Sequence, residues 1–165
     1  GQLGRMLALS GIPLGLEFLF YDRSADVPGA AVAPVVTGGF DDLAALRSFA
    51  RRVDVVSFDW ENVPVASVRA LASLAPAWPP PRALEIAQDR LAEKRLFVRL
   101  GIPVAPHAAV DSLAALERAV ARIGTPGILK TRRLGYDGKG QIRIDGAAQL
   151  AEACAALGGR GLIYE

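Results

Sequence analysis

The first half of the chain alternates between short apolar runs and stretches in which apolar residues recur every three or four positions. The runs predict strands, and the wider spacing predicts amphipathic helices. The pattern predicts a helix after an opening glycine turn, strands over 16–21, 34–37 and 54–58, and helices over 41–52 and 64–74. Strands that alternate with helices of this length predict an α/β domain with a parallel sheet and helices on its faces.

A proline-rich segment over 75–81 interrupts this pattern and is the predicted domain boundary, which divides the chain into 1–81 and 82–165. The second part is expected to contain helices over 89–100, 113–123 and 147–157, and strands over 127–131, 141–144 and 161–164. The chain opens on the glycine turn without a strand before it and ends directly after the last predicted strand. We therefore expect the sequence to be truncated at both ends.

Composition narrows the class of protein. The 165 residues are 52% hydrophobic and carry a formal net charge of +2, which allows a sizeable core but is too small a bias to argue for a nucleic-acid partner. No apolar run has the length of a membrane span, and no signal-peptide pattern is found. The single cysteine, Cys154, cannot form an internal disulfide. These features favour a cytoplasmic protein with a small-molecule partner.

The segment over 128–141, ILKTRRLGYDGKGQ, is the most specific chemical signal. It places Lys130 on a strand predicted to be buried, where an ammonium group needs an anion to compensate its charge. The three glycines of the following loop let backbone N–H groups approach a phosphate closely. A second strand follows the loop, which excludes a Walker P-loop because that motif leads into a helix. We expect a nucleoside triphosphate as the ligand; a hairpin tip with solubilising charges is the alternative.

Three other segments give weaker signals. Gln2 and Arg5 stand in the opening glycine turn, where the positive end of a helix favours an anion, although a turn that only packs the helix on the sheet would look the same. Asp59 and Glu61 follow the third predicted strand, at the edge where ligands bind in open α/β sheets. The alternative is that Asn62 or Glu61 caps the next helix. By pattern alone, the helix over 89–100 has a solvated, charged face.

Four blocks together resemble the ATP-grasp ligases of purine biosynthesis, and more closely the N5-carboxyaminoimidazole ribonucleotide synthetases. The blocks are GQLGRML over 1–7, VVSFDWENVP over 55–64, QDRLAEKR over 88–95, and the glycine-rich segment over 128–141. Their order and spacing match the family across essentially the whole chain. The resemblance implies a Rossmann-like pre-ATP-grasp domain followed by the first part of an ATP-grasp domain. The sequence departs from the family at Asp59, where a glutamate is usual, and at Trp60.

The resemblance also implies roles for individual residues. Arg90 becomes an ATP ligand instead of a solvated side chain, the glycine loop becomes a lid over the nucleotide, and Glu165 begins the hinge that holds adenine. The residues expected to bind ATP are Arg90, Lys130, Gly135, Tyr136, Asp137, Gly138, Lys139, Gly140, Gln141 and Glu165. The residues expected to contact aminoimidazole ribonucleotide are Gln2, Leu3, Glu61, Tyr136, Asp137 and Lys139. Catalytic roles are expected for Lys130, Asp137 and Lys139.

The reaction that the resemblance implies is the carboxylation of 5-aminoimidazole ribonucleotide with ATP and bicarbonate, through carboxyphosphate. Magnesium is expected, with ligands outside this chain, and the family is expected to form homodimers. A fragment that lacks these ligands is expected to be inactive. The alternatives are another ATP-grasp ligase, such as formate-dependent glycinamide ribonucleotide transformylase or a biotin-carboxylase-like protein, and a non-catalytic nucleotide-binding module. A nicotinamide-dependent dehydrogenase is suggested by the opening turn only.

Overall fold

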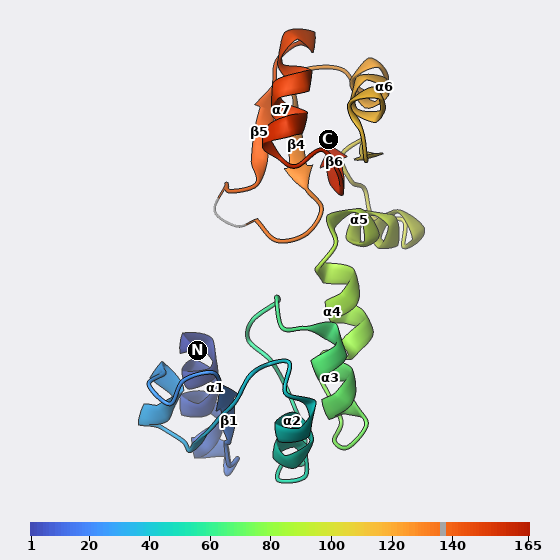
Figure 1. Ribbon diagram of the computed structural model, residues 1–165. Coiled ribbons are helices and arrows are strands. Elements are labelled where there is room, and N and C mark those ends of the chain that lie inside the picture. The colour runs from blue at the N-terminus through green and yellow to red at the C-terminus, as the bar shows by residue number, and fades with distance from the viewer. Residues whose placement is uncertain (136–137) are drawn as a thin grey trace. The chain divides into compact units, whose positions relative to one another are not determined.

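A computed structural model gives the fold of the chain and describes residues 1–135 and 138–165 (Figure 1). The chain divides into two units, Gly1–Glu85 and Ile86–Glu165. The predicted boundary lies within a few residues of this division. Each unit has a core and a sheet of its own, so each is described by itself.

The first unit is an α/β unit with a parallel strand pair. Its elements are α1 (Gln2–Gly11), η1 (Ile12–Leu14), β1 (Phe20–Asp22), η2 (Pro28–Ala31), β2 (Val35–Thr37), α2 (Leu43–Ala50), α3 (Val65–Ala72) and the start of α4 (Pro81–Ala87). Phe20 lies opposite Val35 in the parallel pairing of β1 with β2. Helix α2 begins after Asp42, whose carboxylate accepts hydrogen bonds from the N–H groups of Ala44 and Ala45, as the capping pattern predicts.

The core of the first unit lies between the helices and the extended segments. Its buried members are Leu46, Phe49, Ala50, Val56, Val63, Val68, Leu71, Ala75, Ala77 and Leu84. Ala75 and Ala77 belong to the proline-rich segment, which the sequence pattern describes as a connector. The structure instead packs this segment into the first unit.

The strand predicted over 54–58 is wrong, because its pairing is limited to one bridge between Val56 and Ala77. The Val56 N–H donates to the carbonyl of Pro76 at 2.8 Å, and the Trp78 N–H donates to the carbonyl of Val56 at 2.9 Å. A parallel ladder would next use the N–H groups two residues to either side of Trp78. Both positions are prolines, which have no N–H to donate, so the ladder stops.

Two more elements differ from the pattern. The strand predicted over 16–21 is shorter and shifted, since β1 covers only Phe20–Asp22. Helix α4 was not predicted, although it begins with a proline, a residue favoured at the first helical position. Leu84 on this helix is buried, and Arg82 and Glu85 form an ion pair one turn apart.

The second unit is built on a four-stranded antiparallel sheet. Its elements are α5 (Arg90–Arg99), β3 (Ala108–Val110), α6 (Leu113–Ile123), β4 (Gly127–Thr131), β5 (Gln141–Ile144), η3 (Ala147–Gln149), α7 (Leu150–Ala156) and β6 (Leu162–Tyr164). The strand order is β3-β6-β4-β5, so the two strands that flank the glycine loop are neighbours. The bounds predicted for β4, β5 and α6 are confirmed to the residue.

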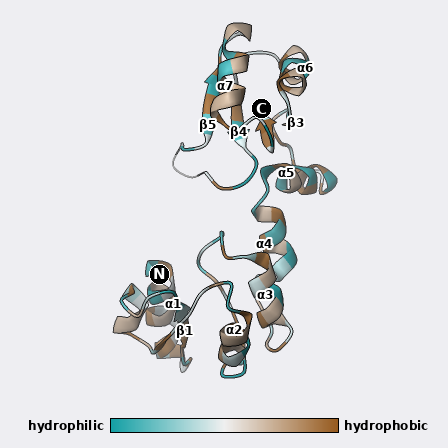
Figure 2. Ribbon diagram, viewed as in Figure 1, coloured by the Kyte–Doolittle hydropathy of each residue, from teal (hydrophilic) through white to brown (hydrophobic). Residues whose placement is uncertain are grey.

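Helices α6 and α7 supply the apolar side chains that cover the core face of this sheet. Both helices carry hydrophobic and hydrophilic stretches (Figure 2), and both contribute to one cluster with the strands. Its buried members are Val110, Leu116, Ala119, Leu129, Ile144, Leu150, Ala153, Cys154, Leu162 and Tyr164. Cys154 is thus the buried apolar side chain that the sequence pattern favours. Strand β4 is thereby fixed at the centre of the sheet.

Candidate functional site

Lys130 lies on the face of the second sheet that is turned away from its core. Successive side chains of a strand point to opposite faces, and Leu129 is fully buried in the core, so Lys130 points the other way. Its partners across the sheet are Ile163 on β6 and Gln141 on β5. Strand β4 lies between β6 and β5 in the sheet, while the Lys130 side chain itself is 24% exposed on the other face. A ligand can therefore reach its ammonium group.

Glu165, directly after β6, supplies the anion that Lys130 requires. Lys130 Nζ donates to one carboxylate oxygen, and Lys94 Nζ pairs with the other. The backbone of Glu165 is held by Ile128, with N···O distances of 2.6 and 3.0 Å. Burial alone would raise the pKa of Glu165, but the hydrogen bonds and charges of the two lysines outweigh it and hold that pKa below its ordinary value. The carboxylate is therefore charged at neutral pH.

The glycine loop is closed at its base by contacts between its two ends. The Thr131 N–H donates to the carbonyl of Gly140 at 2.9 Å. Gly135 has φ of 73°, and a Cβ atom placed on it would come within 2.6 Å of the carbonyl oxygen of Lys139. Leu134, just before it, also has a left-handed φ, of 60°, which is unfavourable for a residue with a side chain. The loop base is both strained and tightly packed.

Arg90 holds this strained base through its guanidinium group. Its Nη1 donates to the carbonyls of Thr131 and Leu134, at 2.9 and 2.6 Å, and its Nη2 donates to the carbonyl of Gly135 at 2.7 Å. The Arg90 N–H also donates to the carbonyl of Arg132 at 2.9 Å. The sequence pattern alone predicts that this helix face is solvated. Arg90 instead contacts loop residues that lie 41 to 45 positions further along the chain.

Asp89 fastens the start of α5 to the same loop. Its carboxylate accepts from Arg132 Nε and Nη2 at 3.1 and 2.5 Å, and from the N–H groups of Leu91 and Ala92 as the helix cap. Burial alone would raise the pKa of Asp89, but the hydrogen bonds from Arg132 and from the backbone outweigh it, so that pKa is lowered. The carboxylate thereby joins the helix to the loop.

Replacing Asp89 by Asn is expected to destabilise the second unit by about 1.5–3 kcal/mol, the usual loss for a hydrogen bond to a charged group. Asn still caps a helix, so the effect isolates the charge, and Asp89→Ala should lose about 1 kcal/mol more. Because the folded pKa is lowered, the carboxylate stabilises the fold above its unfolded pKa of about 3.9 and ceases to do so as pH falls further.

Urea unfolding of wild type and the two variants, followed by circular dichroism between pH 2.5 and 7, measures this contribution. The wild-type advantage over Asp89→Asn should be constant from pH 7 to about 5 and should shrink below about 4. An advantage that stays constant down to pH 2.5 would show that the charge of Asp89 contributes nothing.

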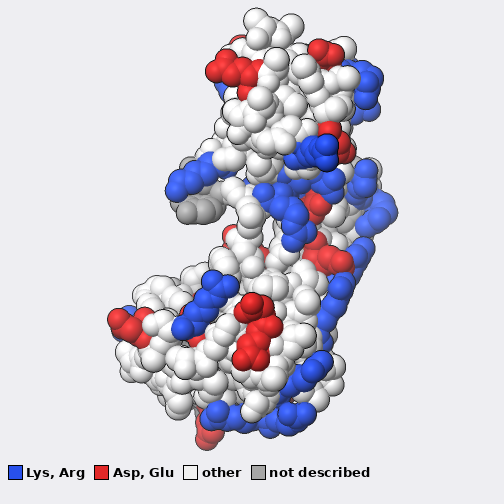
Figure 3. Space-filling view, in the orientation of Figure 1, with Lys and Arg blue, Asp and Glu red and all other residues white. Residues whose placement is uncertain are grey.

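The rest of the glycine loop is only partly described. Tyr136 and Asp137 lie outside the described residues. Gly138 has φ of 80° and is exposed, as are Lys139 and Gln141. On the face shown in Figure 3, basic side chains gather across the part of the second unit that holds α5, with acidic ones among them. Of the residues expected to bind ATP, the structure joins Lys130 to Glu165 and Arg90 to Gly135 by direct contacts.

In the first unit, the opening glycine turn is held by Asp59. Its carboxylate accepts a hydrogen bond from the Gly4 N–H at 2.9 Å. Gly4 packs closely on β1, since a Cβ atom there would meet the Phe20 ring at 3.1 Å. The resemblance placed the role of Asp59 in more doubt than that of Glu61. The structure gives Asp59 a clear part, because the shorter acid still reaches the turn.

Three residues of the first unit are expected at the ribonucleotide, and all three lie at the surface of that unit. Gln2 and Leu3 are exposed on α1, and Glu61 is exposed and accepts a hydrogen bond from Asn62 Nδ2 at 3.2 Å. The N-cap residue of helix α3 is Pro64, which makes no side-chain cap, so the alternative in which Asn62 or Glu61 is the cap is wrong. These exposed side chains are accessible to a ligand.

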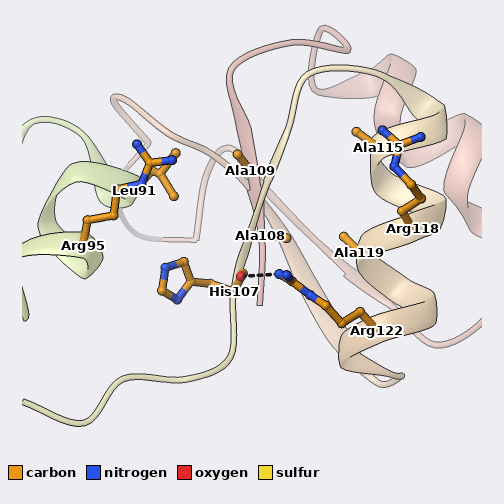
Figure 4. Close-up of a pocket in the computed structure, with 9 residues that line it drawn as sticks. All are labelled: Leu91, Arg95, His107, Ala108, Ala109, Ala115, Arg118, Ala119 and Arg122. Carbon is orange, nitrogen blue, oxygen red and sulfur yellow. Dashed lines mark hydrogen bonds between the residues drawn. The ribbon is translucent and has the colours of Figure 1, made fainter. Parts of the chain in front are cut away.

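A separate cavity of about 590 Å³ lies between α5, β3 and α6 (Figure 4). Its lining residues are Leu91, Arg95, His107, Ala108, Ala109, Ala115, Arg118, Ala119 and Arg122. Arg122 donates to the carbonyl of His107 at 2.9 Å. In the part of the chain that the structure describes, no side chain of this lining takes part in the hydrogen bonds or ion pairs around Lys130 or the glycine loop. Nothing in the sequence pattern pointed to this cavity.

The described residues show neither a cluster of metal ligands nor a membrane-spanning helix. Over residues 1–135 and 138–165, no group of three or more His, Cys, Asp or Glu side chains is placed to hold a metal ion. No helix in the same part of the chain is long and apolar enough to cross a bilayer.

Known protein families match the two units separately. Residues 1–88 match the ribonucleotide synthetase preATP-grasp domain, and residues 95–165 match the ATP-grasp domain. N5-carboxyaminoimidazole ribonucleotide synthase from Pseudomonas aeruginosa is 45% identical over all 165 residues, which cover 46% of its length. The chain thus spans less than half of this relative.

Solved structures show the same similarity. N5-carboxyaminoimidazole ribonucleotide synthetase from Thermus thermophilus superposes on the whole chain with a TM-score of 0.93 and 47% identity, and the chain covers 44% of that protein. The enzyme from Aspergillus clavatus, solved with ADP and 5-aminoimidazole ribonucleotide, superposes with a TM-score of 0.83 and 28% identity, over 100% of this chain and 44% of that protein. The chain belongs to the ribonucleotide synthetase family of ATP-grasp proteins, in which its relatives are N5-carboxyaminoimidazole ribonucleotide synthases.

Proposed function

We propose that the intact protein is an ATP- and bicarbonate-dependent ligase that carboxylates the exocyclic amine of 5-aminoimidazole ribonucleotide, a step of purine biosynthesis. The observation that carries this proposal is the site around Lys130, which combines an accessible cation with a glycine loop and a buried carboxylate. Relatives that match the whole chain, and with it this site, are named N5-carboxyaminoimidazole ribonucleotide synthases, and one of them was solved with ADP and 5-aminoimidazole ribonucleotide.

The residues of this chain suit phosphoryl transfer, which depends mainly on positioning and on neutralising charge. In the proposed reaction a bicarbonate oxygen attacks the γ-phosphorus of ATP, and ADP leaves. The resulting carboxyphosphate delivers its carboxyl group to the amine, which loses a proton, while inorganic phosphate is released. Lys130 would neutralise phosphate oxygens, and the loop N–H groups would hold them in place.

The loop would act as a lid over the nucleotide. Gly135, Gly138 and Gly140 all adopt left-handed φ values, so the loop keeps its backbone free of side chains where phosphates approach. Tyr136, Asp137 and Lys139 are proposed to reach both ATP and the ribonucleotide, and Gln141 to contact ATP. In the first unit, Gln2, Leu3 and Glu61 are proposed to contact the ribonucleotide.

Magnesium, the cellular location and the assembly state are further parts of the proposal. Magnesium would neutralise charge on the ATP phosphates, and its ligands are expected outside this chain. A cytoplasmic location and a homodimeric assembly stay predictions.

The test is ADP release by the intact protein, measured with each candidate acceptor in the presence of ATP, Mg²⁺ and bicarbonate. The proposal expects release that depends on 5-aminoimidazole ribonucleotide, with glycinamide ribonucleotide plus formate giving no more than background. Release with the second acceptor pair would favour a formate-dependent transformylase instead. ATP binding without turnover on either acceptor would favour a non-catalytic nucleotide-binding protein.

A further inference from the structure

Glu165 is shared between two lysines, only one of which stands next to the glycine loop. Lys130 contacts one carboxylate oxygen from β4, and Lys94 contacts the other from α5. The three side chains are largely buried, with exposures of 24% for Lys130, 17% for Lys94 and 11% for Glu165. Charges this poorly solvated interact strongly, so their balance matters to any ligand nearby.

The charge of this cluster does not sum to zero. Two ammonium groups and one carboxylate leave a net charge of +1. With Lys130 alone, Glu165 would form a neutral pair and would compete with a phosphate for the same ammonium group. Because Lys94 takes the second oxygen, Glu165 is divided between two cations, and the cluster keeps one positive charge for an incoming anion.

The geometry of helix α5 determines which of its side chains face the glycine loop and Glu165. Arg90 and Lys94 are four residues apart, so they lie on one side of the helix, facing the loop and Glu165. Leu91 and Arg95 are also four residues apart and line the separate cavity described above (Figure 4). Adjacent residues on one helix therefore serve two different environments, and Arg95 offers a matched control for Lys94.

From this geometry we infer that Lys94 is a positioning residue for phosphate binding: by holding the second oxygen of Glu165, it keeps Lys130 available to a nucleotide phosphate. The inference rests on the proposed function only in taking the ligand to be a nucleoside triphosphate. No residue pattern pointed to this role, because Lys94 and Glu165 are 71 positions apart in sequence.

The experiment measures binding of inorganic tripolyphosphate and of ATP to the intact protein by isothermal titration calorimetry. Tripolyphosphate lacks adenine, so it separates the charge of Glu165 from any contact with the base. The variants are Lys94→Met, Lys94→Arg, Glu165→Gln, the double variant Lys94→Met/Glu165→Gln, and the control Arg95→Met. Circular dichroism and thermal unfolding establish that each variant is folded.

Cluster charge predicts the order of tripolyphosphate affinity. Glu165→Gln, at +2, should bind most tightly, followed by wild type at +1, and Lys94→Met, at zero, should bind about tenfold to a hundredfold more weakly than wild type. The double variant returns to +1 and should recover most of the loss. Lys94→Arg keeps the charge and should stay within about threefold of wild type, and Arg95→Met, at an exposed site, within about twofold.

Equal binding by Lys94→Met and wild type would overturn the inference, as would a double variant that binds no better than Lys94→Met. If Lys94→Met does not fold, Glu165→Gln decides alone, since weaker binding than wild type would also overturn it. Failure of the wild type to bind tripolyphosphate would reject the inference together with the assigned phosphate site. The predicted affinity order in a protein that does not carboxylate the ribonucleotide would reject only the proposed function.

Discussion

Replacing Lys130 by Met is expected to lower kcat/KM for ATP by at least about a hundredfold, the scale of losing one preorganised group that stabilises developing charge. The substitution removes the ammonium group beside the loop and also leaves Lys94 and Glu165 as a neutral pair. Both changes weaken the attraction for a polyphosphate. The effect should therefore exceed that of Lys94→Met, which leaves the Lys130 ammonium group in place.

Stability should change much less than activity, because Glu165 keeps Lys94 as its partner in the Lys130 variant. Steady-state ADP release measures the loss in kcat/KM, and thermal unfolding checks the fold. The control is Arg143→Met on the neighbouring strand β5, where an exposed arginine pairs with Asp145. An equal loss in both variants would mean that general surface charge attracts ATP. A Lys130 variant with nearly wild-type activity would contradict the assigned site.

Most of the second unit could be predicted closely, because the local sequence indicates its helices and the strands β4, β5 and β6. Strand β3 was not predicted. The strand pattern on both sides of the glycine loop leaves no ambiguity, and Ser112 caps α6 at its predicted start through a hydrogen bond to the Ala115 N–H at 3.2 Å. Three closely spaced glycines between two strands also predict a phosphate-type loop without any tertiary information. Both the fold of the second unit and the position of the glycine loop can therefore be predicted from local sequence.

The first unit was harder because its pairing depends on residues far along the chain. The segment around Val56 has strand composition, but prolines in its partner segment stop the ladder, which composition alone does not reveal. Helix α4 was overlooked since it follows a run of prolines that favours an extended reading. Even so, the parallel pairing of β1 and β2 is what alternating strands and helices predicted.

The same distinction separates the predicted from the unpredicted members of the site. Lys130 and the loop glycines are recognisable within one segment of sequence. The contacts of Arg90 with the loop, and of Lys94 with Glu165, exist only once α5 packs against the sheet. The sequence pattern therefore assigns Arg90 and Lys94 to a solvated face. The family resemblance predicts a functional role for Arg90 but none for Lys94.

Gly135 ties these contacts to the geometry of the lid, and replacing it by Ala is expected to weaken ATP binding about a hundredfold. Two costs add. A side chain at φ of 73° costs about 1–2 kcal/mol, and the new Cβ atom would lie 2.6 Å from the carbonyl oxygen of Lys139, which belongs to the backbone and cannot rotate away. If the loop base opens, both the backbone strain and the close contact are relieved, so the closed form of the loop becomes rare. The apparent affinity for ATP falls with the population of this closed form, tenfold for each 1.4 kcal/mol.

Gly138 provides the control that separates the two costs. Its φ is 80°, so alanine there is strained to a similar extent, but the nearest atom to a new Cβ is the side-chain amide nitrogen of Gln141, at 3.8 Å. Gly138→Ala should therefore lose only about tenfold in ATP affinity by isothermal titration calorimetry. Equal losses at both positions would mean that backbone strain alone governs the lid. A larger loss for Gly135→Ala means that ATP binding requires the close approach of the two ends of the loop, at the residue whose carbonyl accepts a hydrogen bond from Arg90.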